Sequence, residues 1–337
     1  MSDTISESFS TEVRNFAVFG EADIKLSDTV TLTVGARYDR EDYSYTNSVD
    51  FGDDINSLGV PDLPESTGDR SFNAFLPKLG LTYDFAPDQA ISFTAQRGYR
   101  AGGASSNLVE ALNGTPNPIS NYDPEFSTTY ELAYRGAFND GATRVSGNVF
   151  YTDWTDMQIS VPGTPSSNPV LAQLDSQYNY DTVNAARAEL YGFELSFETQ
   201  ASDELELFGS LGYVHTRFKD FVSGSNDYSG NELPFAPNWT GNFGGKYTWD
   251  NGFALAADVS YKGAAFQNSA NSITDDARWL VNAHATYDIN EQVVAGFYVR
   301  NLLDKDYATD RYIDPLQQTF IRTGEPRTLG LYLQATF

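Results

Sequence analysis

The sequence has no cysteine, only two histidines and no long apolar run. Without cysteine, the chain can form no disulfide framework, no thiolate metal site and no cysteine nucleophile. With only His215 and His284, and with no Gly-x-Ser-x-Gly motif, we expect no enzyme activity. No stretch provides the roughly 18 apolar residues that a membrane-spanning helix needs, so a helical membrane protein is excluded.

Positive charge is also scarce, because 21 Lys and Arg residues stand against 46 Asp and Glu residues, which gives a formal net charge of −25. The basic residues are scattered along the chain, and the overall negative charge repels phosphate groups, so we expect no nucleic-acid partner. The acidic residues in 50–69 match no cation-binding loop, and we expect a solvated run of charge there. No metal site and no other cofactor is predicted.

Aromatic residues, in contrast, are abundant, with 21 Tyr and 23 Phe, and apolar and polar side chains alternate with a period of two. Such alternation is typical of β-strands that have two chemically different faces. In 29–38, for example, Val30, Leu32 and Val34 lie opposite Thr31 and its polar neighbours. The alternating segments run for about ten to fifteen residues, which is enough to cross a bilayer at a tilt, whereas strands of soluble proteins average about five or six.

The links between these segments form a second pattern, in which short and long links strictly alternate. Six short links rich in Asp, Asn, Gly and Pro are expected at 26–29, 85–89, 139–142, 201–204, 250–252 and 289–291. Six long polar links are expected at 40–69, 101–123, 158–184, 218–235, 264–276 and 304–325. Outer-membrane barrels sort their links in this way, with tight periplasmic turns and long extracellular loops.

These patterns predict an all-β fold, a transmembrane antiparallel up-and-down β-barrel with about 13 strands in this chain. Because complete bacterial barrels usually have an even number of strands, we expect residues 1–337 to be the C-terminal portion of a larger barrel domain. Residues 1–20 also lack the basic start and apolar core of a secretory signal. We therefore expect that a signal was removed or that the chain is incomplete.

Several stretches resemble one family, the TonB-dependent outer-membrane receptors. The stretch VRNLLDKDYATDRY at 299–312 is similar to the family's penultimate strand, which commonly ends in Asn-Leu-x-Asp-x-x-Tyr, here Asn301, Leu302, Asp304 and Tyr307. The stretch IRTGEPRTLGLYLQATF at 321–337 looks like its closing strand, in which Gly330 and the terminal Phe337 resemble the signal read by the barrel-assembly machinery. Further family-like stretches are 16–42, 93–107 and 122–138.

This resemblance implies a barrel of 22 strands around a plug domain, of which the chain would supply about the last 13. It implies a monomeric receptor in the outer membrane of a Gram-negative bacterium, in contact with membrane lipid and lipopolysaccharide. The expected activity is uptake of a scarce solute, most of all a ferric siderophore, with TonB acting through a plug domain that this sequence does not contain. The alternatives are uptake of a cobalamin or oligosaccharide, an ungated diffusion pore, and a soluble β-rich binding module.

Two groups of residues are candidates for ligand binding at the extracellular rim. Arg97, Tyr99 and Arg100 precede the glycine pair at 102–103, and guanidinium groups make charge-assisted contacts to the carboxylate or catecholate oxygens of an anionic iron chelate. The alternative interpretation is that the glycines let the strand bend into a long loop. Tyr178 and Tyr180 present aromatic surface to a ligand or, alternatively, to the headgroup interface.

A third group of charged residues is expected on the wall of the lumen. By alternation, the following side chains lie opposite the lipid-facing side: Arg37, Glu131, Arg135, Lys246, Asp258, His284 and Arg300. They are candidates for contacts with a plug, through hydrogen bonds and ion pairs that change during transport. The alternative is a solvated interior wall.

Overall fold

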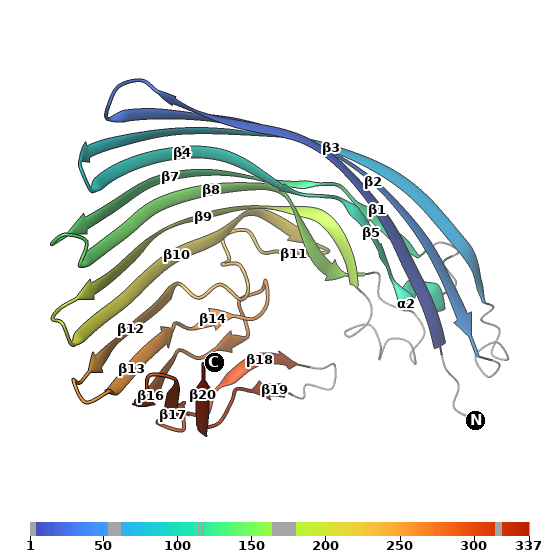
Figure 1. Ribbon diagram of the computed structural model, residues 1–337. Helices are drawn as coiled ribbons and strands as arrows, with labels where there is room; N and C mark the ends of the chain where they lie inside the picture. The colour runs from blue at the N-terminus through green and yellow to red at the C-terminus, as the bar shows by residue number, and fades with distance from the viewer. Residues whose placement is uncertain are drawn as a thin grey trace.

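The computed structural model describes residues 5–52, 62–113, 115, 118–163, 180–313 and 319–336, and about three quarters of them lie in strands (Figure 1). The strands of the main sheet are β1 (Ile5–Lys25), β2 (Val30–Phe51), β3 (Leu63–Ala86), β4 (Gln89–Arg100), β7 (Glu125–Phe138), β8 (Thr143–Pro162), β9 (Tyr180–Gln200), β10 (Leu205–Ser223), β12 (Trp239–Thr248), β13 (Phe253–Lys262), β16 (Arg278–Asn290), β17 (Val293–Arg300) and β20 (Thr328–Ala335).

Every main strand pairs antiparallel with the next one along this order, which confirms the predicted sheet of 13 antiparallel strands. Strands β1 and β20 stand at the two ends of the order, and the described sheet curves into an open arch (Figure 1). The short links all lie at one end of the strands, as expected for an up-and-down meander (Figure 1).

The short links also fall where the sequence predicts them. The links at 139–142 and 201–204, for example, separate β7 from β8 and β9 from β10. In the first of these, Asn139, Asp140 and Gly141 have positive φ angles of 54°, 55° and 88°. Asn, Asp and Gly tolerate this conformation best, which explains why such residues mark the turn in the sequence.

The long links are shorter than predicted, because the strands continue beyond the clear alternation. Residues 40–51 and 63–69, expected within a loop, belong to β2 and β3, and residues 158–162, 180–184 and 218–223 belong to β8, β9 and β10. In the extensions of β2 and β3 the large side chains, such as Tyr43, Tyr45 and Phe72, lie on the polar face and are covered by the link after β4. The alternation therefore changes its face there while the strand pairing persists. The predicted bounds of the long links at 40–69, 158–184 and 218–235 were therefore too wide.

Short elements occupy several long links. They are β5 (Gly103–Ser106), α2 (Leu108–Leu112) and β6 (Ile119–Tyr122) after β4, β11 (Asn226–Asp227) after β10, β14 (Ala265–Phe266) and β15 (Thr274–Asp275) after β13, and β18 (Ala308–Ile313) and β19 (Thr319–Thr323) after β17. The side chain of Asn107 caps α2 by accepting hydrogen bonds from the backbone N–H groups of Val109 and Glu110. Within the described residues, no helix is long and apolar enough to cross a bilayer.

The two faces of the main sheet differ in chemistry. The apolar face carries large exposed side chains in nearly every strand, including Val34, Leu81, Phe93, Leu132, Leu195, Phe243, Phe297 and Leu331. The register places a different set on the polar face, including Glu21, Lys78, Gln96, Glu131, Asn148, Ser196 and Ser210. Exposed apolar area on this scale is unfavourable in water, so the apolar face is suited to a lipid environment.

Two hydrophobic clusters form where long links fold back over the polar face. In one, Tyr43, Tyr45 and Phe72 pack against Ala104 of β5. In the other, Phe218 and Phe221 of β10 pack with Ala186, Ala188 and Leu233. Fully burying a side chain of this size stabilises a fold by about 1.5–3 kcal/mol, so these clusters hold the links in place.

Candidate ligand-binding site

The link after β4 folds over the polar face and forms one side of a candidate site. The Tyr43 hydroxyl donates a hydrogen bond to the Ala104 carbonyl at 3.5 Å, and the Asn47 amide donates to the Ser106 hydroxyl at 3.4 Å. On the other side, the backbone N–H of Thr182 donates to the Ser105 hydroxyl at 3.3 Å. These contacts fix the β5–β6 hairpin between β2 and β9.

The glycine pair after Arg100 is required by the close packing of this hairpin. A Cβ atom added to Gly102 would lie 2.4 Å from the carbonyl oxygen of Tyr122 and 2.6 Å from the ring of Phe72. A Cβ atom added to Gly103 would lie 2.6 Å from the Tyr122 hydroxyl. The glycines thus have a structural role, in letting the link turn inward.

A buried carboxylate joins the hairpin to the wall. Glu125, at the start of β7, is only 3% exposed, and its Oε1 lies 2.9 Å from the Arg100 Nε. Its Oε2 accepts a hydrogen bond from the Gln158 backbone N–H at 2.6 Å. The Gln158 side chain then donates to the carbonyls of Ala101 at 2.7 Å and Asp123 at 3.0 Å, at the two ends of the link.

The link after β4 and the wall line an open cavity of about 510 Å³. The lining residues with polar or charged side chains are Glu41, Tyr43, Arg100, Tyr122, Gln158, Ser160 and Thr182. The side chain of Arg100 is 60% exposed although it is paired with Glu125, so part of its guanidinium group remains open to a ligand. The site therefore offers a cation, the Tyr122 phenol and several hydrogen-bonding groups to a small molecule.

The structure brings together only part of the site predicted from the sequence. Arg100 lines the cavity, whereas the Arg97 guanidinium lies over the Phe126 ring at 4.0 Å from its centroid, and Tyr99 stacks on the same ring. Tyr180 begins β9 and is exposed. Tyr178 lies outside the described residues.

Most of the cavity lining was not identified from the sequence. Tyr43, Tyr122 and Gln158 are far apart in the chain and come together only because the link after β4 folds inward. The one local signal was the alternation in 41–45, which places Tyr43 and Tyr45 on the polar face.

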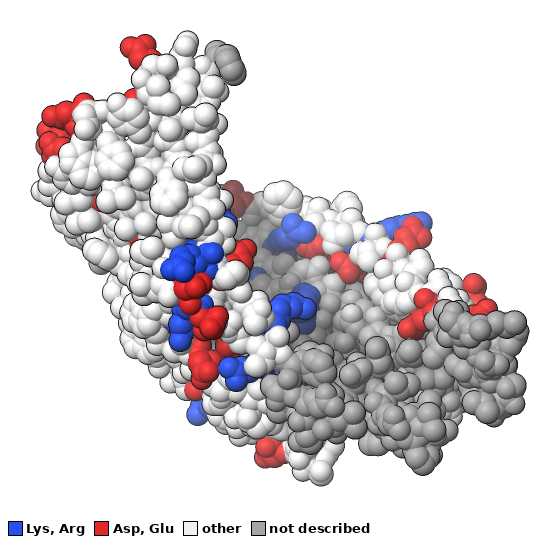
Figure 2. Space-filling model, turned by 90° about the horizontal axis from the view of Figure 1, so that it is seen from below, with Lys and Arg blue, Asp and Glu red and all other residues white. Residues whose placement is uncertain are grey.

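The charged residues predicted for the lumen lie on the polar face. Arg37 pairs with Asp39, and Glu131 accepts a hydrogen bond from Asn148 at 3.2 Å. Asp258, His284 and Arg300 line one cavity of about 400 Å³. In that cavity, the Asp258 carboxylate accepts from the Asn282 amide at 2.8 Å, and the His284 Nε2 lies 2.7 Å from the Tyr332 hydroxyl. Seen from below, the hollow of the arch contains basic side chains (Figure 2).

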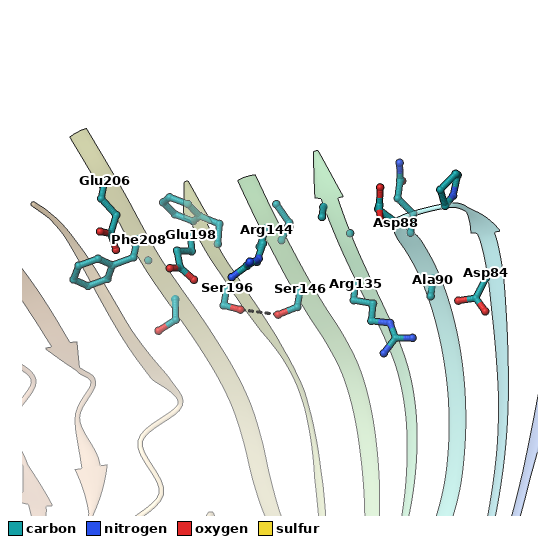
Figure 3. A pocket seen from close by; sticks show the side chains of 18 of the residues that line it. Asp84, Asp88, Ala90, Arg135, Arg144, Ser146, Ser196, Glu198, Glu206 and Phe208 are labelled. Carbon is teal, nitrogen blue, oxygen red and sulfur yellow. Dashed lines mark hydrogen bonds between the residues drawn. The ribbon is translucent and has the colours of Figure 1, made fainter. Parts of the chain in front are cut away.

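A larger cavity, of about 780 Å³, lies against the polar face near the short links. Figure 3 shows its lining, with Arg135 and Arg144 among the carboxylates of Asp84, Asp88, Glu198 and Glu206. The Ser146 and Ser196 hydroxyls are hydrogen-bonded at 2.7 Å across β8 and β9. This end of the wall thus combines charges of both signs with neutral polar groups. Lys246 of β12 lies opposite Glu206 of β10 in the strand register, so its side chain also projects from the polar face.

The inner wall of β1 departs from the polar pattern. Phe19 of β1 lies opposite Arg37 of β2 in the strand register, and the Arg37 guanidinium lies over its ring. Phe19 is nevertheless 75% exposed. Val13 and Phe9 lie on the same face of β1 and are also exposed. Exposed apolar side chains on an otherwise polar wall indicate a surface that packs against another polypeptide segment.

Packing in the last strand, β20, accounts for the glycine at position 330, which the sequence also singled out. Gly330 lies opposite Tyr298 in β17, and a Cβ atom there would be 2.3 Å from the Tyr298 ring. A glycine at this position therefore allows the ring to lie across β20. Phe337 lies outside the described residues.

Glu41 provides a pH-dependent test of the cavity. It lies beyond the first ten or so residues of β2, the length that crosses a bilayer. Burial raises the pKa of this carboxyl, a hydrogen bond from Asn15 lowers it, and the Asp39 charge raises it, with a net upward shift. The folded state therefore favours protonated Glu41, and stability is lost as pH rises through the raised pKa.

We expect Glu41→Gln to raise the thermal unfolding midpoint at pH 7.5 and to leave it unchanged near pH 4. If Glu41→Gln and the parent had the same unfolding midpoint at pH 7.5, the raised pKa of Glu41 would be contradicted.

Comparison with known proteins agrees with this architecture. The family model for TonB dependent receptor-like β-barrels matches residues 3–302. The metal-pseudopaline receptor CntO of Pseudomonas aeruginosa is 23% identical over 333 residues, which cover 97% of this chain and 41% of CntO. The ferric-pyoverdine 358 receptor of Pseudomonas putida is 24% identical over 333 residues, 96% of this chain and 35% of that receptor. The chain thus spans about two fifths of the length of these relatives.

Solved structures show the same fold. The ferric yersiniabactin uptake receptor FyuA from Yersinia pestis superposes with a TM-score of 0.80 at 18% identity, over 99% of this chain and 47% of FyuA. The siderophore receptor PiuA from Acinetobacter baumannii gives a TM-score of 0.72 at 17% identity, over 97% of this chain and 44% of PiuA.

Proposed function

Since this chain belongs to the TonB-dependent receptor-like β-barrel family of outer-membrane receptors, we propose that it supplies an extracellular ligand site and part of the lumen wall of a receptor for a metal chelate. The first candidate ligand is a ferric siderophore. The family and its structural relatives are transport receptors and not enzymes, and no catalytic role is proposed for any residue.

The observation that carries this proposal is the open cavity between the wall and the inward-folded link after β4. Its volume of about 510 Å³ falls in the range of about 300–1,000 Å³ typical of small-molecule sites. Arg100 offers charge-assisted hydrogen bonds to carboxylate or catecholate oxygens, while Tyr122 offers aromatic surface and a hydroxyl group. Because the chelator itself holds the metal ion, the site requires no protein ligand to the metal.

The relatives support the same class of ligand. CntO is a receptor for metal-pseudopaline, FyuA takes up ferric yersiniabactin, and PiuA is a siderophore receptor. These ligands differ from one another, but each of these receptors is named for a metal chelate or a siderophore. For this protein we propose the shared class, a metal chelate or siderophore, and from the chemistry of Arg100 we propose one with anionic oxygen donors.

We further propose that TonB drives uptake through a plug that seats against the polar face. The apolar side chains of Phe9, Val13 and Phe19 on β1 and the mixed charges around Arg135 and Arg144 provide a surface for such a plug. Groups that are already hydrogen-bonded on the wall, such as His284 with Tyr332, can exchange partners as the plug moves.

The test is ligand binding by the full-length protein that contains this chain, purified in detergent. Ferric hydroxamate, ferric catecholate and ferric carboxylate chelates, cobalamin and a maltooligosaccharide series are titrated separately, with tryptophan fluorescence as the readout. We expect saturable binding of at least one ferric chelate, weakened about tenfold by Arg100→Ala. Binding of only cobalamin or oligosaccharide would contradict the ligand class. Steady ohmic conductance in planar bilayers without any ligand binding would instead identify a diffusion pore.

A further inference from the structure

The ligand cavity contains one acidic side chain, Glu41 of β2, to which the proposed function gives no role. Glu41 lines the cavity together with Arg100 of β4. In the strand register it lies opposite Phe72 of β3, and it shares the polar face with Tyr43, two residues further along β2. Because Glu41 and Arg100 border the same volume of about 510 Å³, one small ligand can reach both charges.

The basic side chains around Glu41 are engaged elsewhere. Three of them lie on the polar face in this part of the wall, and each is paired with a different carboxylate. The pairs are Arg37 with Asp39, Arg70 with Asp123, and Arg100 with Glu125. Among the residues that the structure describes, no salt bridge includes Glu41, and its hydrogen-bond partner is the uncharged amide of Asn15.

The charge of the cavity is therefore negative, although it contains a guanidinium group. Arg100 supplies one positive charge, whereas Glu41 and the buried partner of Arg100, Glu125, supply two negative charges. Arg100 can still bind an oxygen anion, because it uses only its Nε–H for Glu125 and a further N–H for the Gln158 carbonyl at 3.3 Å. A ligand with anionic groups alone would, however, be repelled by Glu41.

The surroundings of Glu41 favour a cation as its partner. Burial is the main cause that raises the pKa of its carboxyl, and the neighbouring Asp39 charge adds to this effect. An opposite charge nearby would stabilise the ionised form. A role as acceptor for Asn15 does not explain a carboxylate here, because the Asn15 amide already donates to Asp39 at 2.7 Å and a glutamine oxygen would accept equally well.

We infer that Glu41 binds a protonated amine of the ligand while Arg100 binds its anionic oxygens. The ligand is then an amphoteric chelate, which carries a free ammonium group beside its metal-binding oxygens. An ammonium group has three N–H donors, and the hydroxyls of Ser160 and Thr182 in the same cavity provide further acceptors. This inference rests on the proposed function, since it concerns the same cavity and names a narrower class of ligand.

The test compares chelates that differ only in the charge of one amine. The full-length protein in detergent is titrated by calorimetry with ferrioxamine B, which has a free ammonium group, and with N-acetylferrioxamine B, which has none. A second pair is the ferric complex of Nα,Nα-bis(carboxymethyl)lysine and the same complex with its side-chain amine acetylated. We expect at least one ammonium-bearing chelate to bind at least tenfold more tightly than its acetylated counterpart.

Variants assign this preference to Glu41. We expect Glu41→Gln to weaken the ammonium-bearing chelate about tenfold and to leave the acetylated one unchanged, so that the preference disappears. Glu41→Asp keeps the charge and should keep the preference. The matched control is Glu12→Gln on the neighbouring strand β1, because the Glu12 side chain projects from the opposite face and is exposed. It should leave both affinities at parental values.

The outcomes separate this inference from the proposed function. Equal affinity for the two members of each pair would overturn the inference, as would a preference that persists in Glu41→Gln. An equal loss for both members in Glu41→Gln would show that Glu41 only shapes the wall. Binding restricted to ferric catecholate or ferric citrate, which carry no ammonium group, would overturn the inference and leave the proposed function intact. Failure of every ferric chelate to bind would overturn both.

Discussion

Replacing Gly192 with alanine is expected to distort the pairing of β9 with β10 and to destabilise the folded protein strongly. A Cβ atom at this position would lie 1.9 Å from the Tyr213 carbonyl oxygen and 3.0 Å from the Phe150 ring. Because the nearest atom belongs to the backbone, the neighbouring strand itself must move. We expect a loss of about 3 kcal/mol or more in the free energy of unfolding, at the upper end of overpacking effects.

The measurement is the denaturant midpoint of the full-length protein refolded in detergent, together with its heat-modifiable migration on a gel. Gly20→Ala is the matched control, since Gly20 also lies in a main strand but has no atom within 4 Å of its ideal Cβ position. The control should change the free energy of unfolding by less than about 0.5 kcal/mol. Equal midpoints for the two variants would show that the close approach at Gly192 relaxes without cost.

Removing the Glu125 carboxylate is expected to release the β5–β6 hairpin and to reduce ligand affinity. Glu125→Ala leaves the Arg100 guanidinium without its buried partner and the Gln158 N–H without an acceptor. Leaving buried groups unpaired costs about 1–3 kcal/mol each, and the exposure of Arg100 places the sum toward the lower end. We expect amide hydrogen exchange in 103–107 to accelerate at least tenfold and chelate affinity to fall about tenfold.

Glu12→Ala provides a control of the same chemical type. Glu12 pairs with Arg14 at 2.7 Å, but both side chains are more than half exposed, so the pair contributes little to stability. Exchange in the hairpin and chelate affinity should both stay at parental values in this variant. Unchanged exchange in Glu125→Ala would show that the hydrophobic contacts of Tyr43 and Phe72 hold the hairpin alone. Faster exchange with unchanged affinity would instead place the ligand elsewhere.

The sequence predicts the bilayer-crossing part of the fold well, for a physical reason. Between the short links, one face meets lipid and the other does not, so each strand must alternate, as Val30, Leu32 and Val34 do. The turn at 139–142 is equally legible, because positive φ angles at Asn139 and Asp140 restrict the residue types there.

The candidate site was far less predictable. Arg100 could be selected from the sequence because a guanidinium group typically binds anionic oxygens. Nothing in the neighbouring sequence marks its partner Glu125 or its neighbour Gln158 as part of a site. Their roles depend on the inward folding of the link after β4, which is decided by long-range contacts such as that of Phe72 with Ala104 of β5.

The order of the strands has a consequence for how such receptors diversify. Each main strand pairs with its immediate neighbour along the chain, so the two ends of every long link are anchored by strands only about 4.8 Å apart. A link can therefore lengthen, shorten or be exchanged without shifting the register of any other pair. Recognition at the outer end can change by insertion and deletion, while the membrane-embedded scaffold stays under separate selection.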